Sequence, residues 1–236
     1  MSETVAFVGA VGGGGTTRLT LACAELLARS GRDVAVLDAA YGTQGLADRV
    51  SGRIDPDMTR LCVDDTPLES GLIERSVTAD SGGRLAVCPA RAPFCRVAEA
   101  KAPEAAERFG ARIDEAARRF GYVLIDTPPI AANQAVAAAA GADLVAVVCD
   151  GARAASAVPR TIDRLADIGV DESVTVLTRT TGHPDADVTV PDLGEEPPVV
   201  GGETGRNAVR DVVETTVGVS IERESTEGIL PDVPFR

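Results

Sequence analysis

Apolar residues follow two different patterns along the chain: short continuous runs, and positions repeated at helical spacing. Residues 4–8 are almost wholly apolar and lead into Gly9, a pattern typical of a buried parallel strand that runs into a turn. In residues 16–30 the apolar positions instead recur at helical spacing, and Gly31 follows as a stop signal. The helical face is formed by Leu19, Ala22, Cys23, Leu26 and Leu27. The start of the chain therefore predicts a strand, a glycine-rich loop and a helix.

The same alternation of strands and helices continues as far as residue 178. Further apolar runs predict strands at 34–37, 85–88, 122–125, 144–149 and 174–178. Helical patterns occupy 96–120, with a break expected near Pro103, then 131–140, and 153–168 around Pro159. This spacing predicts an α/β fold with a mostly parallel sheet flanked by helices on both faces. We predict one domain for residues 1–236, with a long polar loop at about 182–205.

The length and charge of the chain limit the kinds of molecule that it is expected to bind. With 236 residues, of which 44% are hydrophobic, the chain can bury one large core. Its net charge of -13 would repel nucleic acid and anionic membranes, so we do not expect DNA binding, although Arg153, Arg160 and Arg164 share one helical segment. The sequence contains neither a secretion signal nor the roughly 20 consecutive apolar residues of a membrane span. We therefore expect a cytoplasmic protein.

Cysteine and histidine give little sign of metal or redox chemistry. The five cysteines are odd in number and lack CxxC spacing, which argues against a disulfide framework or a zinc site. We expect buried free thiols at Cys23, Cys62, Cys88, Cys95 and Cys149. The only histidine, His183, lies in a polar stretch that predicts a surface loop. The acid-rich stretch 55–80 is expected to be a solvated surface.

Residues 9–17 combine glycines and hydroxyls at the end of the first predicted strand. Consecutive glycines let backbone N–H groups turn inward around a phosphate, and the following helix presents its N-terminus to the same anion. The alternative is a flexible turn that binds no ligand. Ligands of such sheets bind at the carboxyl ends of strands, where Asp38, Asp126, Asp150 and Arg179 also fall. Asp150 either lines this cleft or caps a helix before Ala152.

The order of these motifs resembles the ParA/MinD family of deviant Walker A P-loop ATPases. Residues 5–40 are similar to the family's first βαβ unit, whose loop reads K-G-G-V-G-K-T-T. "YVLIDTPP" is similar to its Walker B strand, 142–169 to the strand and helix that follow, "VTVLTR" to a strand with a base-recognition residue, and "GILPDVPFR" to its terminal strand and loop. The resemblance implies a P-loop fold that binds ATP or ADP with Mg²⁺ and positions cellular cargo.

The excess of acids and the scarcity of lysine resemble proteins of salt-loving archaea, which implies a halophilic, acidic protein. Lys101 is the only lysine in the chain. This scarcity on the surface does not explain why the glycine loop has no lysine.

Three charged positions of the family are changed in this chain. Val11 stands where the family's signature lysine reaches phosphates across a dimer, and Thr16 where its P-loop lysine holds the β- and γ-phosphates. Ala40 replaces the second acid of the D-x-D switch, which orients the attacking water. Together these losses imply very slow hydrolysis or none. Arg18 faces about 200° away from Thr16 on the predicted helix and is not a substitute, so a replacement cation would come from another loop or chain.

The resemblance also implies which site residues are retained. Thr17 aligns with the hydroxyl that binds Mg²⁺, Asp126 with the Walker B carboxylate, and Asp38, the only retained switch acid, with the first acid of the switch. These three imply a Mg²⁺ site, direct or through water. The implied nucleotide-binding residues are Gly12, Gly13, Gly14, Gly15, Thr16, Thr17, Arg179, Pro231 and Asp232. The pairs Thr178–Arg179 and Pro231–Asp232 match positions that flank adenine, but either pair is also ordinary at a strand end.

Three functional hypotheses follow. The first is a weak ATP binder or pseudo-ATPase that acts as a scaffold or regulatory partner in positioning or partitioning, as a homodimer or as a heterodimer with an intact relative. The second is an active, ATP-dependent dimerising switch whose cation comes from elsewhere. The third is a ligase of the CobQ and dethiobiotin-synthetase type, which normally needs the P-loop lysine. MinD proteins end in a basic amphipathic helix that this sequence lacks, so we expect no direct membrane binding.

Overall fold

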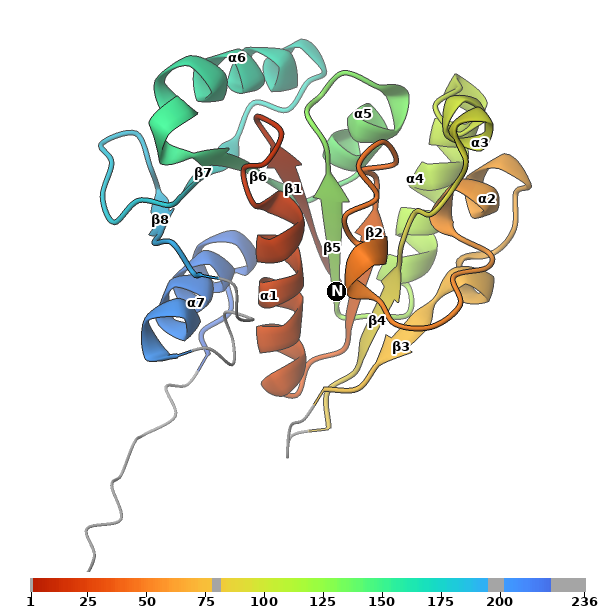
Figure 1. The fold of residues 1–236 in the computed structure, drawn as a ribbon, viewed down its shortest axis with the longest axis horizontal. Coiled ribbons are helices and arrows are strands. Elements are labelled where there is room, and N and C mark those ends of the chain that lie inside the picture. The colour runs from red at the N-terminus through yellow and green to blue at the C-terminus, as the bar shows by residue number, and fades with distance from the viewer. Residues whose placement is uncertain (1, 78–81, 195–201, 222–236) are drawn as a thin grey trace, which may run out of the picture.

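The strand order places the glycine loop near the middle of one large sheet. The computed structural model describes residues 2–77, 82–194 and 202–221. Within these ranges the strands pair in the order β3-β4-β2-β5-β1-β6-β7-β8. Their bounds are β1 (Glu3–Gly9), β2 (Val34–Asp38), β3 (Ile73–Arg75), β4 (Leu85–Cys88), β5 (Tyr122–Thr127), β6 (Leu144–Asp150), β7 (Ser173–Thr178) and β8 (Val188–Val190). β1 thus lies between β5 and β6, and the glycine loop follows its carboxyl end (Figure 1).

Because the central strands are parallel, their carboxyl ends lie together at one edge of the sheet. Every described pairing is parallel except that of β3, which runs antiparallel to β4 at the border of the sheet. The register sets Asp38 of β2 opposite Asp126 of β5, and Gly9 of β1 opposite Val148 of β6. Two acids predicted from separate strand ends are therefore neighbours at the edge that carries the glycine loop.

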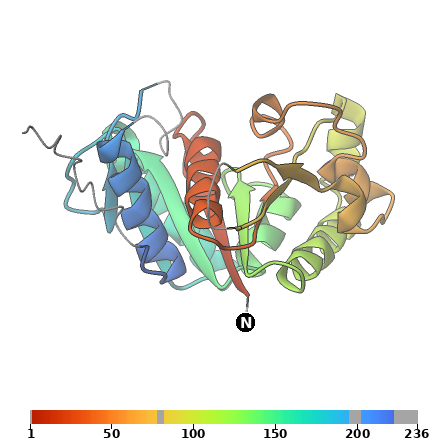
Figure 2. The same ribbon diagram turned by 90° about the horizontal axis from the view of Figure 1, so that it is seen from below.

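Helices cover both faces of the sheet (Figures 1 and 2). One face packs against α1 (Thr16–Arg29) and α7 (Glu203–Val217). The other packs against α4 (Pro103–Ala117), α5 (Asn133–Ala140) and α6 (Ala154–Asp167). The shorter α2 (Met58–Val63) and α3 (Phe94–Glu99) lie beside α4, next to the β3–β4 end of the sheet. Single 3-10 turns occupy Ala47–Arg49, Leu68–Gly71 and Gly151–Arg153.

The two-sided core explains why the strands read as continuous apolar runs. Successive side chains of a strand point to opposite faces, so Val5 and Phe7 of β1 join the core under α1 and α7. Ala6 and Val8 join the core under α4, α5 and α6. Since both faces are covered, no position along β1 needs to be polar, which is typical of buried parallel strands.

The structure confirms the α/β class and the mostly parallel sheet, and it differs from the sequence predictions within 182–205. The expected break near Pro103 is present, because α3 ends at Glu99 and α4 begins at Pro103. Pro159 lies inside α6 without ending that helix. The expected long polar loop, however, contains β8, which pairs with β7, and its last residues belong to α7, which begins at Glu203. A strand of three residues is too short for hydrophobic periodicity to reveal.

The expectation of a solvated surface at 55–80 is wrong for its first half. Asp57 is buried, and Met58, Leu61 and Cys62 belong to the core. The stretch is rich in acids, but apolar residues of α2 and Leu68 of the following 3-10 turn are buried in the core. Four of the cysteines are buried as predicted, whereas Cys95 on α3 is exposed. In the described part of the chain, no helix is long and apolar enough to cross a membrane.

Candidate functional site

Residues 10–15 form the connection between β1 and α1, and two of them require glycine. Gly13 has a φ of 75° and Gly15, which precedes the first turn of α1, a φ of 87°. These are left-handed conformations that residues with a side chain rarely adopt. The backbone at these two positions therefore requires glycine. The tip of the loop is exposed at Gly12 and Gly13, whereas Gly14 is buried.

The carbonyl groups of three consecutive glycines accept hydrogen bonds from side chains of other elements. Arg153 donates to the Gly12 carbonyl at 2.9 Å, and Arg179 donates to the Gly13 carbonyl at 3.0 Å. The hydroxyl of Thr178, which is buried at the end of β7, donates to the Gly14 carbonyl at 2.8 Å. The resemblance implied that Arg179 contacts the base, whereas the structure places both Arg179 and Arg153 on the loop itself.

Asp38 and Asp126 form a buried pair beneath the loop. Asp38 is 0% exposed and Asp126 1%. The Asp38 carboxylate accepts hydrogen bonds from the N–H of Ala40 at 2.8 Å and of Ala90 at 3.0 Å. Burial, followed by the charge of Asp126, raises the pKa of Asp38 to about 8 despite these hydrogen bonds. Burial also raises the pKa of Asp126, to about 6.

The surroundings of Asp126 fit a hard cation. Its Oδ2 atom is buried and has no hydrogen-bond partner among the described residues, an arrangement that is costly unless a ligand completes it. The neighbouring Thr17 hydroxyl and the more distant Arg49 guanidinium both lower the pKa of Asp126, against the larger effect of burial. The described residues hold no cluster of three or more His, Cys, Asp or Glu side chains suited to a metal. Mg²⁺ fits such a site, since it usually takes one or two carboxylates together with substrate phosphates and water.

The three substituted positions put no charge near the loop. Val11 is half-buried and packs against the core beneath α4, α5 and α6. Ala40 is 5% exposed, and its methyl side chain cannot orient a water molecule. Thr16 opens α1, where its carbonyl accepts a hydrogen bond from the Thr20 hydroxyl at 3.0 Å. Arg18 donates to the carbonyls of Leu193 and Gly194, which directs its guanidinium toward the segment after β8, as expected from its helical position.

A cavity of about 320 Å³ adjoins the loop on the β7–β8 side. It is bounded by Gly15 on the loop, by Arg179 after β7, and by Pro191 and Asp192 after β8. Pro191 and Asp192 were not among the predicted site residues, although the run "VTVPD" has the same apolar–Pro–Asp pattern as "ILPD". Pro231 and Asp232 lie outside the described residues, so their expected contact with the base stays a prediction.

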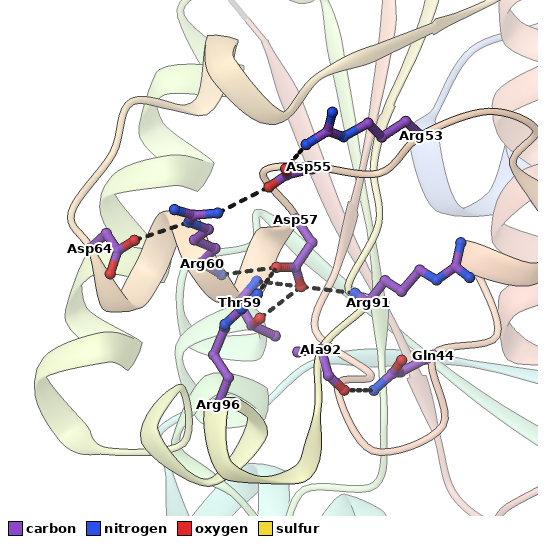
Figure 3. A network of polar contacts seen from close by, with 10 residues as sticks. All are labelled: Gln44, Arg53, Asp55, Asp57, Thr59, Arg60, Asp64, Arg91, Ala92 and Arg96. Carbon is purple, nitrogen blue, oxygen red and sulfur yellow. Dashed lines mark hydrogen bonds and ion pairs between the residues drawn. The ribbon is translucent and has the colours of Figure 1, made fainter.

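A polar network ties α2 and α3 to the β4–α3 loop (Figure 3), and the same loop donates a hydrogen bond to Asp38. The carboxylate of Asp57, at the start of α2, accepts from the backbone N–H of Arg91 at 2.8 Å and from the Arg96 guanidinium at 3.1 Å. The Gln44 amide donates to the Ala92 carbonyl at 2.8 Å. Since the neighbouring Ala90 N–H bonds Asp38, three successive residues of the β4–α3 loop are held by side chains from three different segments.

Other candidates have structural roles. Asp150 accepts a hydrogen bond from the Ala152 N–H at 2.9 Å, which confirms its place as a cap, and it also pairs with Arg179 at 2.7 Å. The Arg179 guanidinium lowers the pKa of Asp150 through this hydrogen bond. His183 accepts from the Asp185 N–H at 3.2 Å in a polar loop, as expected of a surface residue.

Comparison with known proteins identifies the fold. No protein-family model matches the sequence, and no curated protein matches it. Among solved structures, the septum site-determining protein MinD of Pyrococcus horikoshii OT3, complexed with Mg-ADP, has a TM-score of 0.71 at 16% identity over 91% of this chain and 96% of that one. Cobyrinic acid a,c-diamide synthase of Mycobacterium smegmatis, with bound ADP and magnesium, has a TM-score of 0.70 at 16% identity over 94% and 98% of the two chains.

The BceF tyrosine kinase domain is 26% identical over 73% of this chain and 68% of that domain, with a TM-score of 0.55. Together these likenesses show that the chain has the P-loop fold of the MinD type, as the sequence predicted.

Proposed function

We propose that this chain is a ParA/MinD-like P-loop protein that binds ATP or ADP weakly and hydrolyses ATP very slowly or not at all. One observation carries the proposal: the Oδ2 atom of Asp126 is buried without a hydrogen-bond partner in the described ranges, and the Thr17 hydroxyl lies beside it. The chemistry of a metal-assisted phosphate site is therefore kept. The charged groups that would drive hydrolysis are replaced by Val11, Thr16 and Ala40.

The retained groups have distinct roles in this proposal. Thr17 and Asp126 would hold Mg²⁺, with Asp38 in its outer shell, and the ion would neutralise phosphate charge when bound. The amides of Gly12–Gly15 and the N-terminus of α1 would bind the phosphates. The cavity beside Arg179 and Pro191 would take the base. Weak binding follows because no lysine contacts the phosphates.

A scaffold or regulatory partner in intracellular positioning or partitioning is the role we propose for such a protein. It would act as one domain in the cytoplasm, as a homodimer or as a heterodimer with an intact relative that supplies the missing cations. We propose no direct contact with membrane or DNA, because a net charge of -13 opposes both. An active dimerising switch would instead require both ATP-dependent dimerisation and hydrolysis. The ligase hypothesis shares the fold of the diamide synthase, but no observation at the site favours it.

Binding of fluorescent ATP and ADP at molar KCl, with Mg²⁺ or with EDTA, tests the proposal. We expect Mg²⁺-dependent binding in the micromolar range or weaker, and no turnover above background. The variant Asp126→Ala should lose the Mg²⁺ dependence, whereas Asp64→Ala, which removes an exposed acid directly after α2, should keep it. Hydrolysis at a rate usual for P-loop ATPases would contradict the pseudo-ATPase, and absence of all binding would contradict the nucleotide site.

Protein kinase activity is the second candidate, favoured by the 26% identity with the BceF tyrosine kinase domain. Of the two tyrosines in the chain, Tyr41 is buried and Tyr122 is half-buried on β5, so the test uses a separate substrate. Incubation with radiolabelled ATP and a tyrosine-rich peptide separates the two functions. We expect no transfer to the peptide, because Thr16 and Ala40 cannot stabilise the transferring phosphoryl group.

A further inference from the structure

Three hydrogen bonds meet the glycine loop from its outer side. The carbonyls of Gly12, Gly13 and Gly14 accept from Arg153, Arg179 and Thr178, in that order, at 2.9, 3.0 and 2.8 Å. The donors come from the start of α6 and the end of β7, far from the loop in sequence. Three consecutive peptide groups are thus held by side chains of a different part of the fold.

Peptide geometry fixes where the amides of the same groups point. In a trans peptide the C=O and the N–H of the next residue point in opposite directions. The bonds of this loop are trans, since the one cis bond of the described chain is Asp55–Pro56. The N–H groups of Gly13, Gly14 and Gly15 therefore face away from the three side-chain donors. Among the described residues the N–H groups of Gly13 and Gly15 have no backbone acceptor, and the N–H of Gly14 only closes a loose turn toward the Val11 carbonyl, which leaves these groups available to an anion.

Glycine makes this restraint necessary. Four successive glycines, Gly12–Gly15, lose more conformational entropy on ordering than any other residues would. A bond to each carbonyl reduces the freedom of the loop before a ligand arrives, which lowers the cost of binding. Two of the donors are also cationic, and a charged donor on the carbonyl polarises the peptide so that its N–H becomes a stronger donor.

Asp150 holds the two arginines in place. Its Oδ2 atom lies 2.7 Å from Nη1 of Arg179 and 3.9 Å from Nη2 of Arg153. The backbone of Arg179 has a φ of 56°, an unfavourable conformation for a residue with a long side chain, so its contacts must maintain it. Two guanidinium groups and one carboxylate leave a net positive charge next to a loop that has no lysine.

We infer that Arg153, Arg179 and Thr178 form a clamp that orients and polarises the amides of Gly13–Gly15 toward the phosphates of a nucleotide, in place of direct contact by lysine. The inference rests on the proposed function, because it assigns these three residues to the same site. They are positioning residues, since they touch the loop from its outer side. Arg153 and Arg179 place positive charge behind the loop, whereas Val11 and Thr16 leave the phosphates without a direct lysine contact.

Binding of Mg-pyrophosphate and Mg-ADP to the whole chain, measured by calorimetry in molar KCl, tests the clamp. Pyrophosphate has no base, so a loss in Arg179→Ala cannot come from the base cavity that Arg179 also lines. We expect Arg153→Ala, Arg179→Ala and Thr178→Val each to bind pyrophosphate at least fivefold more weakly. Arg160→Ala, which removes an exposed arginine of α6, should leave affinity unchanged. Arg153→Lys should recover part of the affinity, because it restores the charge.

A second measurement separates the clamp from a general effect on folding. In ligand-free protein labelled with ¹⁵N-glycine, Arg153→Ala and Arg179→Ala should shift the amide resonances of Gly13 and Gly14 and speed their hydrogen exchange, with Arg160→Ala as the control. Wild-type affinity in all three clamp variants would overturn the clamp and leave the proposed function standing. Absence of binding by the wild-type chain would overturn both. Lower melting temperatures with unchanged pyrophosphate affinity would reduce the three residues to structural supports and overturn the inference.

Discussion

Asp38 and Asp126 are register partners on β2 and β5, so two buried carboxyl groups face each other at the edge of the sheet that carries the glycine loop. Without a cation the pair opposes its own ionisation, since burial and mutual repulsion raise the pKa of Asp38 to about 8. The same pair would favour Mg²⁺, whose charge offsets both effects. In the proposed function, a metal–phosphate ligand would therefore relieve the mutual repulsion of the two carboxylates.

This pair predicts a pH-dependent difference in stability between the wild type and Asp126→Asn. In the unfolded chain these acids lose their protons near pH 4, whereas the folded protein keeps them up to about pH 6 for Asp126 and about pH 8 for Asp38. The folded state therefore binds more protons across this window, and its stability falls as pH rises. We measure the free energy of unfolding by urea denaturation in EDTA. From pH 4 to pH 8, the difference between Asp126→Asn and the wild type should change by at least about 1 kcal/mol in favour of the variant. Parallel profiles would contradict the prediction.

The Thr17 hydroxyl should be needed for stabilisation by Mg-ADP. Saturating Mg-ADP should raise the melting temperature of the wild type, because a ligand that binds only the folded state stabilises it by mass action. Thr17→Ala should lose most of this increase, as should wild type in EDTA. Thr215→Ala removes an exposed hydroxyl of α7 and serves as the control. An equal Mg²⁺-dependent increase in both variants would separate Thr17 from the metal.

Restoring the loop lysine should strengthen nucleotide binding without restoring hydrolysis. In Thr16→Lys the new ammonium can form charge-assisted hydrogen bonds with phosphate, worth about 1.5–3 kcal/mol, so we expect ATP affinity to rise roughly tenfold or more. Turnover should stay at background, because Ala40 still provides no acid to orient water. Thr215→Lys makes the same charge change on α7 and controls for net charge. Wild-type affinity in Thr16→Lys would mean that the loop does not hold phosphate.

Removing the Asp57 carboxylate should loosen α2 and α3. Asp57→Ala leaves the buried N–H of Thr59 and the N–H of Arg91 without their acceptor and removes the ion pair with Arg96. Loss of a helix cap together with these bonds should cost about 3 kcal/mol of unfolding free energy, measured by urea denaturation. Asp64→Ala breaks only the exposed pair with Arg60 and should cost less than about 0.5 kcal/mol. Equal losses in the two variants would contradict the buried network.

One thiol per folded chain should react quickly with a thiol reagent. Cys95 is exposed on α3, whereas the other four cysteines are buried. Burial also raises the pKa of Cys62 to about 11, which leaves little reactive thiolate at neutral pH. Cys95→Ser should abolish the fast phase of labelling under native conditions and leave the slow phases intact. Fast labelling of any remaining cysteine in Cys95→Ser would show that the core opens readily.

Much of the fold followed from sequence because parallel strands buried on both faces give unbroken apolar runs, as in residues 4–8 and 144–149. Helices α1 and α4 were equally evident, since each has one apolar stripe and a clear start or stop at Gly31 or Pro103. The strand β8 was not, because three residues carry no measurable period. Burial of Asp57 was also missed, since its partners Arg91 and Arg96 lie more than 30 residues away.

Sequence by itself determined which chemical groups the site can contain: a glycine loop with two hydroxyls, acids at strand ends, and no lysine at Val11 or Thr16. Tertiary structure alone decided how these groups meet. Strand register sets Asp38 against Asp126. The strand order β1-β6-β7 brings Arg153, which follows β6, and Arg179, which follows β7, onto the carbonyls of Gly12 and Gly13. These contacts join residues that are far apart in the sequence, so they depend on the order of the strands in the sheet, which local residue patterns do not encode.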